Sequence, residues 1–336
     1  MGSIIPLKIN FIMMKEIIPP VEKELLLQEL TPDKLKCETN YGHNEIYIFT
    51  AHDSPHLMRE VGRLRELSFR RAGGGTGKEC DIDEYDTAPD PYHQLIVWDP
   101  KFKEILGGYR FYIPHEGESG DSIASKLVTS HWFRFSDKFK QEYLPYTIEL
   151  GRSFVQPAYQ STNPQRARKG IYALDNLWDG LGTLIVDHPH MKYFFGKVTM
   201  YPSFNKEARN LILCFLNKFY GDREGLVKPI KPLPMDCNVE EMEQVFSAPT
   251  VQENYRILVK KVRAHHENIP PLISAYMSLS PTLKVFGTVI TEDFGNVEET
   301  GIMITIKDLY IEKVERHVSS YKRWRYYLSR DKFFPQ

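Results

Sequence analysis

Residues 146–155 read Tyr-Thr-Ile-Glu-Leu-Gly-Arg-Ser-Phe-Val, and this stretch decides the fold. Apolar side chains alternate along it with smaller or polar ones, a pattern that predicts a buried β-strand. Glu149 and Arg152 nevertheless place charge inside the strand, and charge is costly to bury unless it is paired or faces a cleft. In a regular strand these two side chains would point to opposite faces, because successive residues alternate.

A glycine, Gly151, stands between the two charged residues. Glycine inside a strand often marks a β-bulge, and one extra residue would bring Glu149 and Arg152 onto the same face. We therefore expect a bulged central strand that presents both side chains to one pocket. A structural ion pair at the end of the strand is the alternative, and this stretch alone does not choose between them.

The whole chain has the composition of a globular protein, with 336 residues, 42% of them hydrophobic, and a formal net charge of −1. The near-zero charge argues against a dedicated nucleic-acid-binding protein. Its four cysteines are scattered without metal-ligand spacing, so we predict reduced thiols, no metal site and a cytoplasmic location. No apolar run is long enough to cross a membrane, and the start of the chain lacks the basic leader expected of a signal peptide.

Hydrophobic periodicity predicts helices and strands on both sides of the central strand. The first long helix begins at Ser54-Pro55, a capping side chain followed by a proline, and continues with leucines at helical spacing. Residues 93–98 and 104–112 form a predicted hairpin, and residues 221–235 a linker. The other predicted strands span 45–50, 194–200, 283–290 and 300–306, and the other predicted helices lie within 22–30, 122–143, 171–186, 205–219, 238–266 and 270–279.

Three polar segments between these elements invite a functional interpretation. The glycine-rich residues 73–78 fail the phosphate-loop spacing and precede Glu79 instead of Ser or Thr, so we predict a flexible loop over an active site. Residues 81–86 are acidic but lack the glycine and the distant glutamate of a calcium-binding loop. Residues 166–170, Arg-Ala-Arg-Lys-Gly, precede a helix and predict an anion site, with a solvated basic turn as the alternative.

Several features follow one another in a recognisable order along about residues 46–306. They are Arg65 with Phe69, the D-x-D-x-x-D of Asp81, Asp83 and Asp86, Tyr109-Arg110, the run Glu149-Leu150-Gly151-Arg152, and the segment from Pro271-Leu272-Ile273 to Asp293-Phe294. In this order they resemble the ornithine-lipid-type N-acyltransferases and, more distantly, the acyl-homoserine-lactone synthases; some members of the group carry the older name hemolysin. The phosphate loop usual in the fold of these enzymes, Q/R-x-x-G-x-G/A, is absent from the sequence, and we expect residues 166–170 to substitute for it.

The resemblance implies an α/β fold of the GNAT acyltransferase type. Its central sheet is expected to be mixed and mostly antiparallel, with a bulged central strand and helices on its flanks. The expected organisation is an N-terminal arm over 1–45, an acyltransferase core over 46–220, and a segment over 221–336. That last segment is expected to hold a helical insertion, the closing strands and a basic aromatic tail packed on the core.

The resemblance also implies an activity. Enzymes of this group move a long acyl chain, plain or 3-hydroxylated, from acyl carrier protein to the amine of an amino acid such as glycine or ornithine, which begins the synthesis of an amino-acid lipid. The expected donor is therefore acyl carrier protein, with acyl-CoA as the alternative, and no bound cofactor or metal is implied.

The resemblance assigns roles to individual residues. Glu149 is the expected base for the acceptor amine, with Asp83 as second choice. Backbone N–H groups at the bulge beside Gly151 are expected to bind the oxyanion. The expected substrate-binding residues are Arg110, Arg152, Asp81, Asp86 and Arg65, and these same residues would equally form a scaffold of ion pairs. The expected contacts for the phosphopantetheine arm of the carrier are Arg166, Arg168 and Lys169.

Three other functions compete with this one. An acetyl-CoA-dependent N-acetyltransferase would keep the fold, but the missing phosphate loop counts against it. A homoserine-lactone synthase fits less well because the chain is much longer than that family. A non-catalytic protein that binds a partner, or the inner face of a membrane, would use the basic aromatic tail at 321–334, for which a docked helix is the simpler interpretation.

Overall fold

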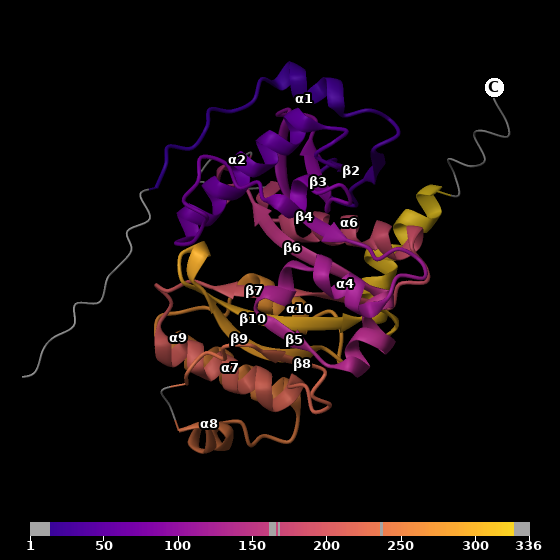
Figure 1. Ribbon diagram of the computed structural model, residues 1–336. Coiled ribbons are helices and arrows are strands. Elements are labelled where there is room, and N and C mark those ends of the chain that lie inside the picture. The colour runs from indigo at the N-terminus through magenta and orange to yellow at the C-terminus, as the bar shows by residue number, and fades with distance from the viewer. Residues whose placement is uncertain (1–13, 161–165, 167–168, 236–237, 326–336) are drawn as a thin grey trace, which may run out of the picture.

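The computed structural model describes residues 14–160, 166, 169–235 and 238–325. The strands of its central sheet are β1 (Leu35–Glu38), β2 (Glu45–Phe49), β3 (His93–Asp99), β4 (Glu104–Tyr112), β6 (Thr147–Val155), β7 (Tyr193–Met200), β9 (Lys284–Thr291) and β10 (Val297–Thr305). They lie in the order β1-β2-β3-β4-β6-β7-β10-β9 (Figure 1). The pair β6–β7 is parallel and the other neighbouring pairs are antiparallel. This arrangement confirms the predicted α/β fold with a mixed, mostly antiparallel sheet.

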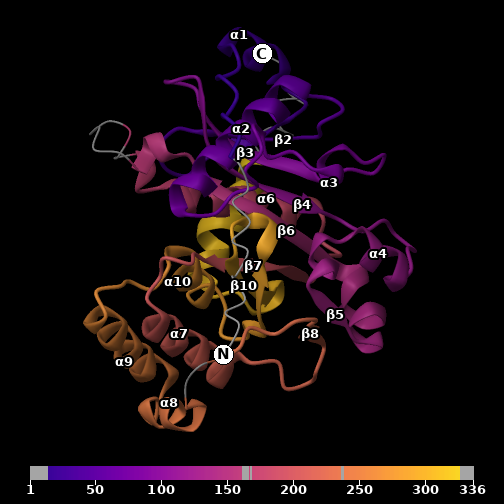
Figure 2. The same ribbon diagram turned by 60° about the vertical axis from the view of Figure 1, so that its left-hand side comes forward.

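Helices cover both faces of this sheet (Figures 1 and 2). One face carries α1 (Lys23–Glu29), α2 (Pro55–Ala72) and the segment 120–146. The other carries α6 (Ala173–Asp187), α7 (Lys206–Tyr220), α9 (Val251–Ala264) and α10 (Pro271–Met277). The alternation of strand side chains explains the division, since Leu95 and Val97 pack with α6 whereas Ile96 and Trp98 pack with α2. Shorter helices are α3 (Glu84–Thr87), α4 (Gly120–Lys126), α8 (Val239–Val245) and α11 (Ile311–Lys313).

The bulge predicted at Gly151 is present in β6, one residue further along the strand. Two residues, Arg152 and Ser153, face the single residue Tyr109 of β4, because the register shifts there. Arg152 takes a φ of 49°, a left-handed conformation that residues with a side chain seldom adopt. As expected from the sequence, the bulge brings Arg152 to the same cavity as Glu149.

The strands β6 and β7 separate partway along their length. Their parallel pairing ends at Leu150 and Gly196. Beyond that point β6 continues paired with β4, and β7 continues paired with β10. Two strand edges therefore face each other across an opening in the middle of the sheet.

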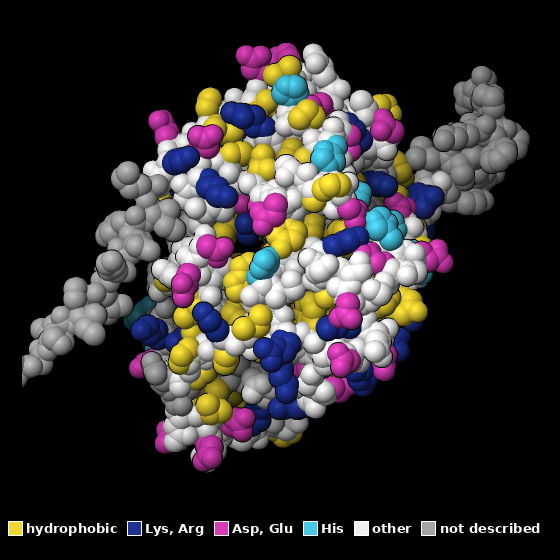
Figure 3. Space-filling model, viewed as in Figure 1, with side chains coloured by type: hydrophobic (Ala, Val, Ile, Leu, Met, Phe, Trp, Pro, Cys, Tyr) yellow, Lys and Arg dark blue, Asp and Glu magenta, His cyan; other side chains and the backbone are white. Residues whose placement is uncertain are grey.

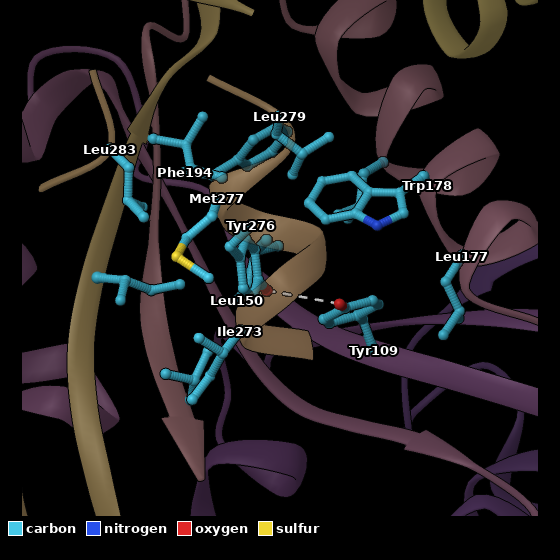
Figure 4. Close-up of a cluster of buried hydrophobic side chains, with 14 of the residues drawn as sticks. Tyr109, Leu150, Leu177, Trp178, Phe194, Ile273, Tyr276, Met277, Leu279 and Leu283 are labelled. Atoms are coloured by element: carbon cyan, nitrogen blue, oxygen red, sulfur yellow. Dashed lines mark hydrogen bonds between the residues drawn. The ribbon is translucent and has the colours of Figure 1, made fainter. Parts of the chain in front are cut away.

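Helix α10 closes the far side of this opening. Its Ile273 and Tyr276 belong to the same apolar cluster as Leu150 of β6 and Trp178 of α6 (Figure 4). The hydroxyl of Tyr276 lies 3.5 Å from that of Tyr109, and both phenols are buried. The opening thus has a polar strand edge on one side of the sheet and an apolar wall on the other.

Some local predictions were wrong. Residues 133–135, predicted within a helical stretch, form β5 (Phe133–Phe135), which pairs with β8 (Val227–Pro229) inside the predicted linker. Phe133 and Phe135 are buried and flank exposed Arg134 with the period of a strand, and the pairing with β8 holds this conformation. The predicted helix over 238–266 is divided into α8 and α9, because Thr250 forms a new N-terminal capping box with Glu253.

The helices, the surface and the C-terminal tail all bear on the membrane-binding alternative. No helix among the described residues has the length and apolarity needed to cross a bilayer. On the face shown in Figure 3, basic and acidic side chains are interspersed. The described part of the C-terminal tail is docked: Tyr321 is buried, and its hydroxyl lies 3.2 Å from Asp187 of α6. Residues 326–336 of the predicted tail lie outside the described residues.

Candidate active site

Two adjoining cavities lie on the sheet face that carries α2. The first, of about 220 Å³, reaches into the opening between β6 and β7, where Glu149, Ser153 and Leu272 line it. The second, of about 550 Å³, is bordered by the loop around Lys78 and by Trp132. The walls common to both cavities are Arg110, Val128, Arg152, Lys197, Phe294 and Glu299.

Glu149 is buried in the wall of the first cavity and is surrounded by hydrogen-bond donors. One carboxylate oxygen accepts the backbone N–H of Thr129 at 3.0 Å and the hydroxyl of the same residue at 2.5 Å. The other accepts the backbone N–H of Val128 at 3.3 Å and the hydroxyl of Tyr92. An ionised carboxylate offers about four lone-pair sites, so these donors occupy them. A proton from a substrate therefore has to reach Glu149 through one of the donors already in place.

Tyr92 is the donor best placed to pass such a proton on. It lines the first cavity beside Glu149, and its oxygen also accepts the backbone N–H of Val128 at 3.0 Å. Burial raises the pKa of Tyr92 well above its ordinary value, and the neighbouring Glu149 carboxylate raises it further. The phenol is thus neutral and able to donate. Sequence analysis did not single out Tyr92, because a tyrosine just before a strand carries no distinctive signal.

The predicted acidic and basic residues meet in one chain of ion pairs. Asp86 lies 3.2 Å from Arg65 and 3.3 Å from Arg110, and Arg110 lies 2.7 Å from Asp83. Burial alone would raise the pKa of Asp86, but Arg65 and Arg110 outweigh it, so the pKa lies well below its ordinary value. For Arg110, burial lowers the pKa, but Asp86 and then Asp83 raise it more. Both groups remain charged in the folded protein.

The same aspartates also hold the backbone. Asp83 is the N-cap of α3, where its side chain accepts the N–H groups of Tyr85 and Asp86, and Asp86 returns a bond to the Asp83 N–H at 3.2 Å. Arg65 is fully buried and donates to Gln94 at 2.5 Å. This placement favours the scaffold alternative for Asp83, Asp86 and Arg65, and it leaves Asp83 poorly placed as a second base.

Arg152 and Asp81 close the chain of ion pairs at the cavity wall. Arg152 Nε lies 2.9 Å from Asp81 Oδ2, yet the two atoms lack hydrogen-bond geometry. The guanidinium lies over the Phe294 ring at 4.4 Å from its centroid and has a second carboxylate, Asp83, at 3.6 Å. Arg152 is therefore the predicted arginine with the most donor capacity left at the cavities.

The structure adds an ion pair that the sequence analysis missed. Lys197 of β7 lies 2.5 Å from Glu299 of β10, and both side chains line both cavities. Burial lowers the pKa of Lys197, and the Glu299 carboxylate offsets this only in part. A signal was present, because Lys197 interrupts an apolar strand just as Glu149 does in residues 146–155.

The glycine-rich loop borders the second cavity, as predicted. Thr76 and Lys78 line it. The loop is anchored to α2, because the carboxylate of buried Glu66 accepts the N–H of Thr76 at 3.0 Å and that of Gly77 at 2.8 Å. Its position over the site therefore depends on a buried carboxylate as well as on its glycines.

The predicted anion site looks different in the structure. Arg166 pairs with Glu104 at 2.8 Å, and Lys169 pairs with buried Asp99 at 2.5 Å. Both cations thus pair with carboxylates of the chain itself, and neither lines the two cavities. The third predicted residue, Arg168, lies outside the described residues.

The chain is similar in sequence to known acyltransferases. Residues 64–166 match the family model of the acetyltransferase (GNAT) domain. The chain is 53% identical over 92% of its length to a protein of Phocaeicola vulgatus named glycine N(alpha)-acyltransferase, of which the alignment covers 94%. It is 54% identical, again over 92% of its length, to a protein of Bacteroides thetaiotaomicron with the same name, of which 91% is covered.

One similar solved structure is that of the CoA-dependent acyl-homoserine lactone synthase BjaI with SAM and isopentyl-CoA. The match covers 83% of this chain and 90% of that chain, with 12% sequence identity and a TM-score of 0.37. The sequence relatives decide the assignment, because they align over more than nine-tenths of both chains. The protein belongs to the family of these two relatives and is an acyltransferase with a GNAT domain.

Proposed function

We propose that this protein moves a long acyl chain from the thioester of acyl carrier protein to the amine of glycine, the first step toward an amino-acid lipid. The observation that carries the proposal is the position of Glu149 and the bulge at Arg152 on the opening between β6 and β7. The names of both relatives support glycine as the acceptor. The missing phosphate-loop pattern in the sequence supports a carrier-linked donor over free coenzyme A.

The opening in the sheet suits an extended thioester arm. Strand edges that have lost their partner can pair with the amides of an extended ligand, as in recognition by strand addition. A pantetheine arm has such amides, and the opening lies between the separated edges of β6 and β7. The apolar cluster around Leu150 and Ile273 lies behind it and offers an apolar environment for the acyl chain.

Proton removal is the first chemical demand, since the glycine amine is protonated near neutral pH. In the proposed step the ammonium gives one proton to the Tyr92 oxygen while Tyr92 passes its own proton to Glu149. The neutral amine then attacks the thioester carbonyl, forming the C–N bond. The carbonyl oxygen takes up negative charge, for which the N–H groups at the bulge are the proposed donors.

Collapse of the tetrahedral intermediate completes the transfer. The C–S bond breaks, and the thiolate leaves with little help because a thiolate is only a weak base. The second proton of the attacking nitrogen passes to the thiolate, and Glu149 returns its proton through Tyr92 to solvent. The products are N-acylglycine and the thiol of the carrier.

The experiment that tests the proposal is a thiol-release assay with a long-chain acyl carrier protein, run against a panel of amino acids that includes glycine and ornithine. Release that depends on glycine and is lost in Glu149→Gln supports the proposal. Turnover with acetyl-CoA but with no carrier-linked chain would replace it with the small-acyl alternative. Acylation of ornithine in preference to glycine would correct the acceptor.

A further inference from the structure

Lys197 stands at the edge of the opening where the two substrates have to meet. It is the first residue of β7 beyond the last pair with β6, Leu150–Gly196. Glu149 is aligned with Phe195, so Lys197, two residues further on, points to the same face of the sheet as Glu149. Both side chains line the first cavity, Glu149 from one strand edge and Lys197 from the other.

The ammonium of Lys197 is held in place by its neighbours but keeps unused N–H donors. Glu299 accepts from it at 2.5 Å, and the group lies 3.5 Å from the centroid of the Trp132 ring. Glu299 is itself fixed by the hydroxyl of Thr291 at 2.6 Å. An ammonium has three N–H donors, and within the described part of the chain Glu299 is the one hydrogen-bonding acceptor that Lys197 contacts. Donor capacity therefore remains at the junction of the cavities.

Stability alone is a weak reason for this ion pair. Both side chains are close to buried, with 12% and 9% of their surfaces exposed. Removing two charges from water is expensive, and apolar residues of similar size often stabilise a protein equally well. A buried pair that faces two cavities is better explained by a ligand with charge of its own.

The arginines expected to bind the substrate carboxylate each lie near two carboxylates, whereas Lys197 lies near one. Arg110 contacts Asp83 at 2.7 Å and Asp86 at 3.3 Å, and it is almost fully buried. Arg152 contacts Asp81 and Asp83 and lies over the Phe294 ring. With Arg65, which pairs with Asp86, the network holds three arginines and three aspartates, so its charges balance among themselves. Lys197 faces a single carboxylate.

We propose that Lys197, oriented by Glu299 and Trp132, binds the α-carboxylate of the acceptor amino acid, so that the amine of the acceptor faces Tyr92 and Glu149 across the opening. This inference rests on the proposed amino-acid acylation and deepens it. It makes the acceptor a zwitterion held at both ends. An amine without a carboxylate, such as glycinamide, is then a poor acceptor.

The test measures binding and turnover separately. Calorimetric titration of the full chain with glycine and with glycinamide gives affinities that need no acyl transfer. Lys197→Met should weaken glycine binding by about 10–100-fold, the range for losing one charge-assisted hydrogen bond, and leave glycinamide binding unchanged. Lys197→Arg should recover part of the loss. In the thiol-release assay the preference for glycine over glycinamide should disappear in Lys197→Met, through KM for glycine rather than through KM for the donor.

The neighbouring pair Arg209–Glu298 provides a matched control. Glu298 precedes Glu299 on β10 and so points to the opposite face, where Arg209 of α7 lies 2.6 Å from it. Arg209→Met should lower stability without changing the preference for glycine. If Lys197→Met folds and keeps the wild-type preference, the inference is overturned while the acylation stands. Lys197-dependent glycine binding without any acyl transfer would instead overturn the proposed function alone, and absence of glycine binding by the wild-type protein would overturn the inference.

Discussion

The hydroxyl of Tyr92 donates to the carboxylate of Glu149, and both side chains line the cavity that enters the opening between β6 and β7. This bond turns a buried carboxylate, whose oxygens already accept four hydrogen bonds, into the end of a short relay. The relay needs the phenol to be neutral, and burial together with Glu149 keeps the pKa of Tyr92 raised.

The first prediction concerns this relay. Glu149→Gln removes the final proton acceptor and should lower kcat by about 10²–10⁴-fold, the usual range for general-base catalysis. Tyr92→Phe removes the intermediate carrier and should lower kcat by a similar factor, because among the described residues Tyr92 is the one tyrosine that donates a hydrogen bond to Glu149. Thiol release under saturating donor and glycine is the measurement.

Tyr112→Phe is the control for Tyr92→Phe. The two rings pack with centroids 5.3 Å apart, but the Tyr112 hydroxyl donates to Asp90 at 2.9 Å, away from Glu149. A loss of activity in Tyr112→Phe equal to that in Tyr92→Phe would show that both hydroxyls act by holding the structure with their hydrogen bonds, and not by proton transfer.

The second prediction concerns stability and pH. Asp86 has a pKa that is low in the folded protein because Arg65 and Arg110 outweigh its burial. A group whose pKa is depressed by folding stabilises the protein at pH values above its unfolded pKa of about 3.9, and that contribution is lost as the pH falls below this value. Urea titrations should therefore show a steep fall in the free energy of unfolding below about pH 4.

Asp86→Asn tests the assignment of that fall. At neutral pH the substitution leaves two buried arginines short of a carboxylate and should cost about 3–5 kcal/mol of the free energy of unfolding. It should also flatten the dependence of stability on pH in the acidic range. A steep acidic fall that is unchanged in Asp86→Asn would assign it to other carboxylates.

The sheet and the bulge were predictable because they depend on local pattern. The alternation in residues 146–155 predicted the strand, and charge on both sides of Gly151 predicted a bulge with Glu149 and Arg152 at one pocket. The resemblance to the N-acyltransferases, rather than pattern alone, identified the aspartates and arginines that form the network. It did not decide between substrate binding and a scaffold, because that depends on which charges lie within reach of each other in space.

The rest of the site comes from pairings distant in the sequence. The Tyr92–Glu149 bond joins the residue just before β3 to a residue of β6, and Lys197 meets Glu299 only because β7 and β10 are neighbours. Residues 133–135 became a strand because residues 227–229 lie beside them. Lys169 was predicted to bind an anion because it stands before a helix. The sequence does not show that buried Asp99 lies beside it in the fold.

The third prediction concerns the acyl donor. Leu272, in the first turn of α10, lines the first cavity next to the opening. Leu272→Trp would fill part of the 220 Å³ cavity and should raise KM for a long-chain donor while sparing folding. Ile290→Trp, on an exposed position of β9, is the size-matched control and should leave KM unchanged. Equal donor kinetics in the two variants would mean that the acyl arm does not use this opening.

The last prediction separates a structural from a binding role for Lys169. Its ammonium lies 2.5 Å from Asp99, a carboxylate with no exposed surface that also accepts the Tyr159 hydroxyl at 2.9 Å. Lys169→Met leaves Asp99 buried without its cation and should cost about 3–5 kcal/mol of stability. Since Lys169 is engaged by this internal carboxylate, KM for the acyl carrier protein should change little at a temperature where the variant is folded.

The double variant Lys169→Met, Asp99→Asn removes the uncompensated charge and should recover part of the stability. A large rise in KM for the carrier that persists in the double variant would instead assign Lys169 to the phosphopantetheine arm, as its position before the helix first indicated.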